Sequence, residues 1–224
     1  MPDKLLPCVE INPTRAAKAS VICLHGLGAD GHDLESLATQ LATPEQAVRF
    51  VFPHAPERPI TRSDGYVMRA WYDVYGPDLA EKFDEAGIRV SEQQVRALIE
   101  REVQRGVAAQ RIVLMGFSQG GAMALQAGLR YPERLGGILA LSIYLLLPDT
   151  LEREANPANA DVPIMMTHGT LDDVIPLARG EAARARLREL GYQVQWRVYP
   201  MPHTLCAPEI EDMADWLRLI LGEE

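Results

Sequence analysis

The stretch of sequence that decides the fold is Gly116-Phe117-Ser118-Gln119-Gly120-Gly121. The run 111–115 leads into it and is apolar after its first residue, as is typical of a strand buried on both faces. The run 122–127 leads away from it and contains few residues that resist helix formation. This second run must end before Tyr131-Pro132, because the residue before a proline disfavours α geometry. The sequence therefore predicts that Ser118 lies on a sharp turn between a buried strand and a helix.

The two glycines at 116 and 120 fit such a turn, because a Cβ at either position would crowd the approaching backbone. A Gly-x-Ser-x-Gly sequence between a strand and a helix is the pattern called a nucleophile elbow, which exposes a reactive serine at the end of a sheet. The alternative is a glycine-rich joint whose serine only caps the helix. We favour the catalytic interpretation, because the flanking elements and the partner residues described below agree with it.

The rest of the chain alternates between predicted strands and predicted helices. Strands are expected at 5–11, 20–24, 48–53, 137–142, 163–169 and 193–199, and helices at about 33–41, 91–103, 176–190 and 210–221. This alternation predicts an α/β fold with a mostly parallel central sheet and helices on both faces. No internal repeat or linker is apparent, so residues 1–224 are expected to form a single domain. Ligands of such sheets bind beyond the carboxyl ends of the strands, where the unusual loops of this chain also lie.

Two long segments show no sustained periodicity of apolar residues. Residues 54–87 are interrupted by prolines and glycines but contain aromatic residues, so we interpret them as an irregular excursion packed near the active site. Residues 143–161 are expected to form a loop. The sequence Ser91-Glu92-Gln93-Gln94 reads as a capping box and predicts that the following helix begins there.

Composition excludes several classes of partner. The chain has 224 residues, of which 47% are hydrophobic, and a formal net charge of −9, which argues against nucleic acid or anionic lipid as the main partner. Its longest apolar stretch, 136–148, is shorter than the roughly 18–20 residues of a membrane span. The amino terminus lacks a signal pattern, so a soluble cytoplasmic protein without integral membrane contact is expected. The cysteines, Cys8, Cys23 and Cys206, have neither disulfide nor zinc spacing, and we expect no metal or other cofactor.

A serine nucleophile needs a histidine base, which in turn needs an acidic residue to orient it. After a nucleophile elbow these partners follow in chain order, first the acid and then the histidine. Only His203, between the last strand and the last helix, has that order and place, although an exposed loop histidine is the alternative reading. The loop after 163–169 offers Asp172 and Asp173 as the acid. The residues alone favour Asp172 only mildly, and the aspartates in the preceding loop, Asp149 and Asp161, are weaker candidates.

The oxygen of a tetrahedral intermediate needs two N–H donors. One should be the backbone of Gln119, directly after the nucleophile and at the positive end of its helix. The other should come from the glycine-containing loop 25–31, where Leu27 is the candidate, whereas His25 itself is expected to be structural. Apolar residues of the two irregular segments could form a wall for an acyl chain, with plain packing as the alternative. These candidates are Trp71, Tyr72, Tyr75, Ile143, Leu145 and Leu146.

With these residues assembled, the sequence resembles the phospholipase/carboxylesterase group of α/β-hydrolases, which includes the acyl-protein thioesterases. The motifs that carry the resemblance span nearly the whole chain and lie at 25–32, 69–73, 116–121, 168–172 and 201–203. The resemblance implies the α/β-hydrolase fold, Ser118, Asp172 and His203 as the catalytic triad, and Leu27 with Gln119 as the oxyanion hole. It settles Asp172 over Asp173 and implies short-to-medium acyl esters, lysophospholipids or acyl thioesters as substrates.

Two positions depart from the usual pattern of this group. Pro202 stands before the histidine where glycine is common, and Ile143 stands where a smaller residue is common. The first departure predicts a stiffer or tilted loop around His203, and the second predicts a narrower pocket.

The leading expectation is a cofactor-free serine hydrolase that cleaves carboxylic esters of small molecules through an acyl-enzyme. The first alternative is an acyl-protein thioesterase, and the alternative from another class is a binding protein on a hydrolase scaffold. The sequence leaves a homodimer open.

Overall fold

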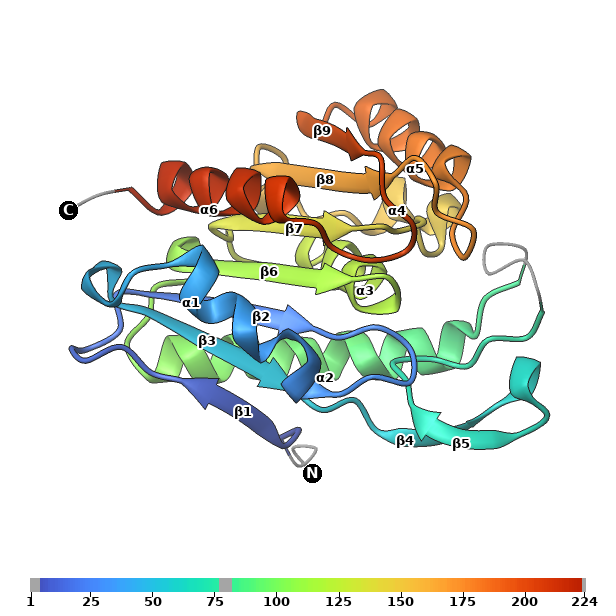
Figure 1. Cartoon of the computed structure of the whole chain (residues 1–224), viewed down its shortest axis with the longest axis horizontal. Coiled ribbons are helices and arrows are strands. Elements are labelled where there is room, and N and C mark those ends of the chain that lie inside the picture. Colours follow the sequence, from blue (N-terminus) through green and yellow to red (C-terminus); the bar gives the residue numbers. More distant parts are fainter. Residues whose placement is uncertain (1–4, 77–81, 223–224) are drawn as a thin grey trace.

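The computed structural model describes residues 5–76 and 82–222, and within them a seven-stranded sheet forms the centre of the molecule (Figure 1). The strands follow the spatial order β1-β3-β2-β6-β7-β8-β9, and β1 alone runs antiparallel, against β3. The strands are β1 (Cys8–Ile11), β2 (Ala19–Leu24), β3 (Val48–Pro53), β6 (Ile112–Phe117), β7 (Gly137–Leu141), β8 (Ile164–Gly169) and β9 (Val194–Tyr199). The predicted strands and their mostly parallel arrangement are thus confirmed, the first strand being shorter than expected.

Helices cover both faces of this sheet. They are α1 (Ala38–Leu41), α2 (Glu85–Gln104), α3 (Gln119–Gly128), α4 (Pro148–Glu154), α5 (Leu177–Glu189) and α6 (Ala207–Leu221). Helices α1 and α6 lie on one face, and α2 and α3 lie on the other (Figure 1). Because the middle strands are buried on both faces, the continuous apolar runs of the sequence are explained by two cores, one on each side of the sheet. Among the described residues, no helix has both the length and the apolar composition required to cross a membrane.

The start of α2 differs from the expected capping box. The helix begins at Glu85, six residues before Ser91, and the Asp84 carboxylate caps it by accepting the Gly87 N–H at 2.9 Å. Ser91 lies inside the helix, and its hydroxyl donates a hydrogen bond to the Trp71 carbonyl oxygen. The prediction of a helix start at Ser91 was therefore wrong. A serine within a helix is tolerated when its hydroxyl finds such a partner, which the local sequence does not reveal.

The two segments expected to be irregular contain short elements. Residues 54–76 include a two-stranded hairpin of β4 (Glu57–Ile60) and β5 (Tyr66–Arg69), joined through the 3-10 helix Thr61–Ser63. Strands of four residues carry too little alternation to be recognised from sequence. The loop expected at 143–161 contains α4, which has proline in its first turn, a signal that the sequence does offer. The expected helix at 33–41 is a 3-10 helix, Gly31–Leu37, followed by the single turn α1.

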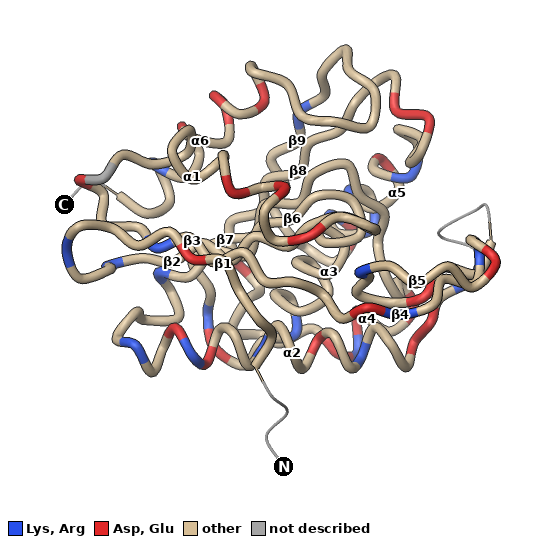
Figure 2. The backbone as a smooth tube through the Cα atoms, turned by 60° about the horizontal axis from the view of Figure 1, so that its bottom comes forward, with Lys and Arg blue, Asp and Glu red and all other residues tan. Residues whose placement is uncertain are grey.

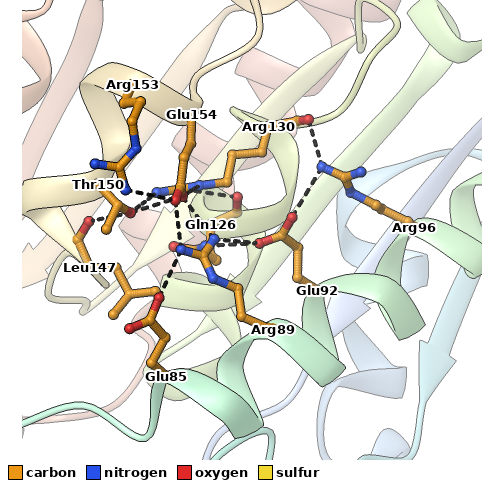
Figure 3. Close-up of polar contacts among 10 residues, drawn as sticks. All are labelled: Glu85, Arg89, Glu92, Arg96, Gln126, Arg130, Leu147, Thr150, Arg153 and Glu154. Carbon is orange, nitrogen blue, oxygen red and sulfur yellow. Dashed lines mark hydrogen bonds and ion pairs between the residues drawn. The ribbon is translucent and has the colours of Figure 1, made fainter.

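Ionic contacts join α4 to α2 and to the segment after α3. Figure 2 shows acidic and basic residues interspersed along α2, and Figure 3 shows how some of them converge on Glu154 of α4. The Glu154 carboxylate accepts hydrogen bonds at 2.8 Å from Arg89 of α2 and from Arg130 after α3, and at 2.9 Å from Thr150. Partial burial would raise the pKa of Glu154, but these three donors outweigh it and lower the pKa to about 2. This network fixes the segment after β7, which forms one side of the site described next.

Candidate functional site

Ser118 occupies the single residue between β6 and α3. Its backbone has φ 55° and ψ −121°, a conformation that a residue other than glycine adopts only under constraint from its surroundings. The constraint comes partly from hydrogen bonds, because the Ser118 N–H donates to the Leu141 carbonyl oxygen of β7 at 2.8 Å and the Ser118 carbonyl accepts from Ala122 at 3.0 Å. The predicted sharp turn between strand and helix is confirmed.

The glycines on either side of the serine are required by close backbone approach. A Cβ at Gly116 would lie less than 3.0 Å from the backbone of Gly120, and a Cβ at Gly120 would lie less than 3.0 Å from the Leu24 carbonyl oxygen of β2. No real Cβ tolerates such distances, so both positions exclude every other residue unless the backbone moves. The physical reason given for these glycines from sequence therefore holds.

A cavity of about 500 Å³ opens at Ser118, beyond the carboxyl ends of the parallel strands. The volume falls in the range of small-molecule sites, and the lining combines apolar side chains with polar and charged ones. Of the five residues predicted as triad and oxyanion hole, the four that line this cavity are Leu27, Ser118, Gln119 and His203. The fifth, Asp172, is buried behind His203 and contacts it directly.

Asp172 and His203 form a close pair. The His203 Nδ1–H donates to Asp172 Oδ2 at 2.7 Å, and Asp172 Oδ1 accepts the backbone N–H groups of Val174 at 3.0 Å and Ile175 at 2.7 Å. With both oxygens engaged, the carboxylate is fixed in place and presents one oxygen to the imidazole. The neighbouring Asp173 is exposed. Because Nδ1 carries the proton shared with Asp172, the His203 Nε2 is the nitrogen that can accept a proton.

Ser118 and His203 line the same cavity. Among the described residues, no hydrogen bond joins the serine hydroxyl to the imidazole. Catalytic hydrogen bonds are commonly long in ligand-free sites and tighten once substrate binds. The His203 ring is held from one side by Phe117, the residue before the serine, with 4.7 Å between the ring centroids.

Pro202, the residue before the histidine, does not prevent the pairing with Asp172. Its carbonyl oxygen accepts the Thr204 N–H at 2.8 Å, and the preceding Met201 carbonyl accepts the Leu171 N–H at 3.1 Å. The second bond ties the loop that carries His203 directly to the loop that carries Asp172.

His168 supports the acid from behind and was not predicted to do so. This histidine is fully buried at the end of β8, and its Nε2–H donates to the Ile175 carbonyl oxygen at 2.8 Å. The same nitrogen lies 3.6 Å from Asp172 Oδ2. His168 thus helps to fix the turn 172–175 that orients the carboxylate.

The backbone N–H groups of Leu27 and Gln119 are available at the cavity. Within residues 5–76 and 82–222, neither N–H donates to another backbone group outside the regular elements, and Gln119 is the first residue of α3. The first N–H groups of a helix have no partner within the helix. Both N–H groups can therefore receive a hydrogen-bond acceptor that enters the cavity.

The Gln119 side chain has a second function in the structure, which the sequence did not reveal. Its Oε1 accepts the Trp71 N–H at 2.8 Å, and its Nε2 donates to the Tyr72 carbonyl oxygen at 2.9 Å. The Trp71 indole N–H in turn donates to the His25 carbonyl oxygen at 2.9 Å. These bonds tie the excursion 54–76 to both the elbow and the loop after β2.

The residues predicted as an acyl-chain wall lie elsewhere, because their side chains are used for packing. None of the six lines the cavity within the described part of the chain. Trp71, Tyr72, Ile143 and Leu146 are buried in the main core, Leu145 packs against that core, and Tyr75 lies under the Lys82 ammonium group. The neighbours Val74 and Tyr144 line the cavity instead. Ile143 therefore does not narrow the cavity directly.

Two further buried residues have shifted pKa values, and one of them lines the cavity. His25 lines the cavity, but its Nε2 accepts the Ala55 N–H at 3.0 Å and its Nδ1–H donates to the Gly26 carbonyl, which suits the structural role expected for it. Burial lowers the pKa of His25, so the neutral form is favoured. Glu209 of α6 is fully buried and accepts the Thr167 hydroxyl at 2.5 Å, and burial raises its pKa to about 7. The described residues include no group of three or more His, Cys, Asp or Glu side chains placed to hold a metal ion.

The sequence profile of the phospholipase/carboxylesterase family matches residues 7–221. The chain is 40% identical over 210 residues to acyl-protein thioesterase 1 of Gibberella zeae, which covers 89% of each chain. It is 42% identical over 209 residues to acyl-protein thioesterase 1 of Neurospora crassa, which covers 89% of this chain and 85% of that protein.

Solved structures show the same likeness. Arabidopsis thaliana SOBER1 superposes with a TM-score of 0.87 and 31% identity, covering 92% of this chain and 100% of that chain. Zea mays acyl-protein thioesterase 2 superposes with a TM-score of 0.85 and 28% identity, covering 96% of this chain and 99% of that chain. The likeness spans nearly the whole chain, so it includes the strands and loops that build the cavity.

Proposed function

Because the chain belongs to the phospholipase/carboxylesterase family of α/β-hydrolases, we propose that it is a serine hydrolase that cleaves fatty acyl thioesters. Ser118 is the nucleophile, His203 is its general base, and Asp172 orients the imidazole. The observation that carries the proposal is the convergence of a constrained serine and an aspartate-bound histidine on one cavity.

The reaction follows from the hydrogen bond between His203 and Asp172. The Ser118 Oγ attacks the acyl carbonyl carbon while its proton moves to His203 Nε2, the nitrogen that does not bond Asp172. The carbonyl oxygen becomes an oxyanion, and the N–H groups of Leu27 and Gln119 donate to it. The bond from carbon to the leaving sulfur or oxygen then breaks, and His203 returns the proton to the leaving group. Water attacks the acylated serine by the same route and releases the acid.

Two lines of argument favour a thioester over a carboxylic ester. The two relatives that match about nine-tenths of this chain at 40% and 42% identity both have the name acyl-protein thioesterase 1. A thiol is also a much stronger acid than an alcohol, so the sulfur departs with less help from His203. Cleavage of carboxylic esters of short-to-medium acyl chains, including lysophospholipids, is the second candidate, because the same cavity and the same hydroxyl serve both reactions. The substrate in either case is an apolar acyl group, and we propose no cofactor.

Labelling with a fluorophosphonate tests the nucleophile. The wild-type chain should be labelled, and Ser118→Ala should not. Ser142→Ala is the matched control, because Ser142 also has a positive φ of 51°, directly follows the neighbouring strand β7 and is fully buried. Labelling of folded Ser118→Ala at the wild-type rate would reject Ser118 as the nucleophile, and a folded wild type that is not labelled would favour a binding protein on a hydrolase scaffold.

Kinetics on matched substrates test the substrate class. An octanoyl thioester and the corresponding octanoyl oxygen ester differ in one atom, so their ratio of kcat/KM reports the leaving group alone. A ratio well above the ratio of their uncatalysed hydrolysis rates supports the thioesterase assignment. A ratio below it would make carboxylic esters the better substrate class.

A further inference from the structure

Arg62 brings a positive charge to the wall of the cavity at Ser118. It belongs to the 3-10 helix between β4 and β5, far along the chain from the elbow. Among the described Lys and Arg residues, it is the one whose side chain lines the cavity at Ser118. Arg62 is exposed, so its guanidinium lies at the rim of the cavity rather than at its base.

The arginines near Arg62 on the hairpin have acidic partners. Arg58 lies 3.8 Å from Asp84, and Arg69 lies 3.8 Å from Glu57. Within residues 5–76 and 82–222, the Arg62 guanidinium forms no ion pair and no side-chain hydrogen bond, although the chain carries a net charge of −9. An unpaired guanidinium beside a cavity retains all of its donors for an anion that enters from solvent.

The turn that carries Arg62 is held rigidly, and the carboxylate that holds it, Asp73, is already engaged. Asp73 accepts the Thr61 N–H at 2.8 Å and the Thr61 hydroxyl at 2.5 Å, and it also accepts the Val74 N–H at 2.7 Å. The Arg62 N–H donates to the Val74 carbonyl oxygen at 2.7 Å. The backbone of Arg62 is thus fixed against the cavity wall, which lowers the entropy cost of binding a ligand there.

The charge of Arg62 acts on the cavity wall itself. Tyr144 lines the cavity, and its hydroxyl is paired with that of Tyr72 at 2.7 Å. Burial raises the pKa of Tyr144 to about 12, and the positive charge of Arg62 opposes this rise. The guanidinium is therefore close enough to influence Tyr144, a group that lines the same cavity as Ser118. The cavity lining also includes Asp33, whose carboxylate accepts the Asp30 N–H at 2.7 Å and so caps its own helix.

From these contacts we propose that Arg62 selects substrates whose leaving group carries an anion, a phosphate or a carboxylate, close to the scissile bond. The inference rests on the proposed hydrolase function. The acyl chain is apolar and cannot be what a guanidinium recognises, so the anion belongs to the part of the substrate that leaves. Arg62 is a specificity-determining residue in this scheme and takes no part in the bond-breaking steps.

Substrate pairs that differ only in charge test the inference. In the first pair, an octanoyl thioester is formed on the cysteine of a short peptide whose neighbouring residue is aspartate or asparagine. In the second pair, octanoylglycerol is compared with octanoylglycerol 3-phosphate, so that a carboxylate source and a phosphate source are tested separately. The ratio of kcat/KM, anionic over neutral, is measured for wild type, Arg62→Gln and Arg62→Glu. Arg134→Gln is the control, because this exposed arginine pairs with Asp161 and lies outside the cavity lining.

We expect wild type and Arg134→Gln to prefer the anionic member of at least one pair by about tenfold, the low end for a hydrogen bond to a charged group. Arg62→Gln should bring the ratio close to one, and Arg62→Glu should invert it. The wild-type preference should also shrink as ionic strength rises from about 10 mM to about 1 M. Whichever pair shows the effect identifies the source of the anion.

Two outcomes would overturn the inference, and they differ in what they reject. Efficient wild-type hydrolysis of the neutral substrates with ratios that Arg62→Gln leaves unchanged rejects the role of Arg62 but not the hydrolase function. Failure of wild type to hydrolyse any member of either pair, anionic or neutral, rejects the proposed function and the inference together.

Discussion

A buried carboxyl group makes the stability of this protein depend on pH in an unusual direction. Glu209 has no solvent exposure, and its contacts are the Thr167 hydroxyl at 2.5 Å and the Cys206 N–H at 3.4 Å. Burial outweighs these two hydrogen bonds and raises the pKa of Glu209 from 4.5 to about 7. The folded protein therefore holds a proton on this residue at pH values where the unfolded chain has lost it.

The size of the effect follows from the shift. A change of roughly 2.5 pKa units corresponds to about 3 kcal/mol, at about 1.4 kcal/mol per unit. Below about pH 4.5 the carboxyl group is protonated in both states and has no effect on stability. Between pH 4.5 and 7 the folded state binds more protons, so the free energy of unfolding falls as pH rises. Above pH 7 the full cost of the buried charge is present. Over the range pH 5.5 to 8, Glu209 should lower the free energy of unfolding by about 2 kcal/mol.

Denaturant unfolding of wild type and Glu209→Gln at pH 5.5 and pH 8 measures this contribution. The amide does not titrate, so the variant should lack the part of the pH dependence that Glu209 causes, whatever the substitution does to absolute stability. Glu211→Gln is the matched control, because Glu211 lies on the exposed side of the same helix and should leave the wild-type dependence unchanged. Parallel pH dependences for wild type and Glu209→Gln would refute the reasoning.

Three further substitutions have defined outcomes. Asp172→Asn should lower kcat on an octanoyl thioester by about 10⁴-fold with unchanged circular dichroism, because an amide stabilises neither the required tautomer nor the imidazolium; a loss below tenfold would contradict the assigned acid. Gly120→Ala should destabilise the fold by about 3 kcal/mol or more in denaturant unfolding, because its Cβ would collide with the Leu24 carbonyl oxygen; an unchanged midpoint would show that the backbone can yield. Glu154→Gln should cost about 2 kcal/mol at pH 7 and progressively less as pH falls toward 2, because the lowered pKa means that the wild-type ion pairs are lost there. The exposed Glu152→Gln should change stability by less than about 0.5 kcal/mol, and equal effects of the two glutamate variants would disprove the role of the network.

The part of the site that could be predicted from sequence is the part fixed by local chemistry. The turn at Ser118 was predictable because two glycines and two flanking periodicities act within about ten residues of each other. The pairing of His203 with Asp172 joins residues 31 positions apart, and chain order together with family resemblance identified it before any distance was known.

The part that could not be predicted depends on contacts between distant segments. Trp71 and Tyr72 look like pocket residues in a list of aromatics, but their backbone groups bind Gln119 and their side chains are buried. Ser91 resembles a helix cap in sequence, but in the structure its hydroxyl donates to the Trp71 carbonyl oxygen. In each case the deciding partner lies at least 20 residues away, beyond the reach of periodicity or capping rules.

The Gln119 side chain couples two parts of the site mechanically. The backbone N–H of Gln119 faces the cavity, and its side-chain amide forms hydrogen bonds with the main chain of Trp71 and Tyr72. Outward displacement of the hairpin 57–69 by a ligand would strain these two hydrogen bonds and shift the Gln119 N–H next to Ser118. The space available to a larger ligand and the alignment of the Gln119 N–H are therefore coupled, and a wider cavity entrance comes with a less well-aligned N–H.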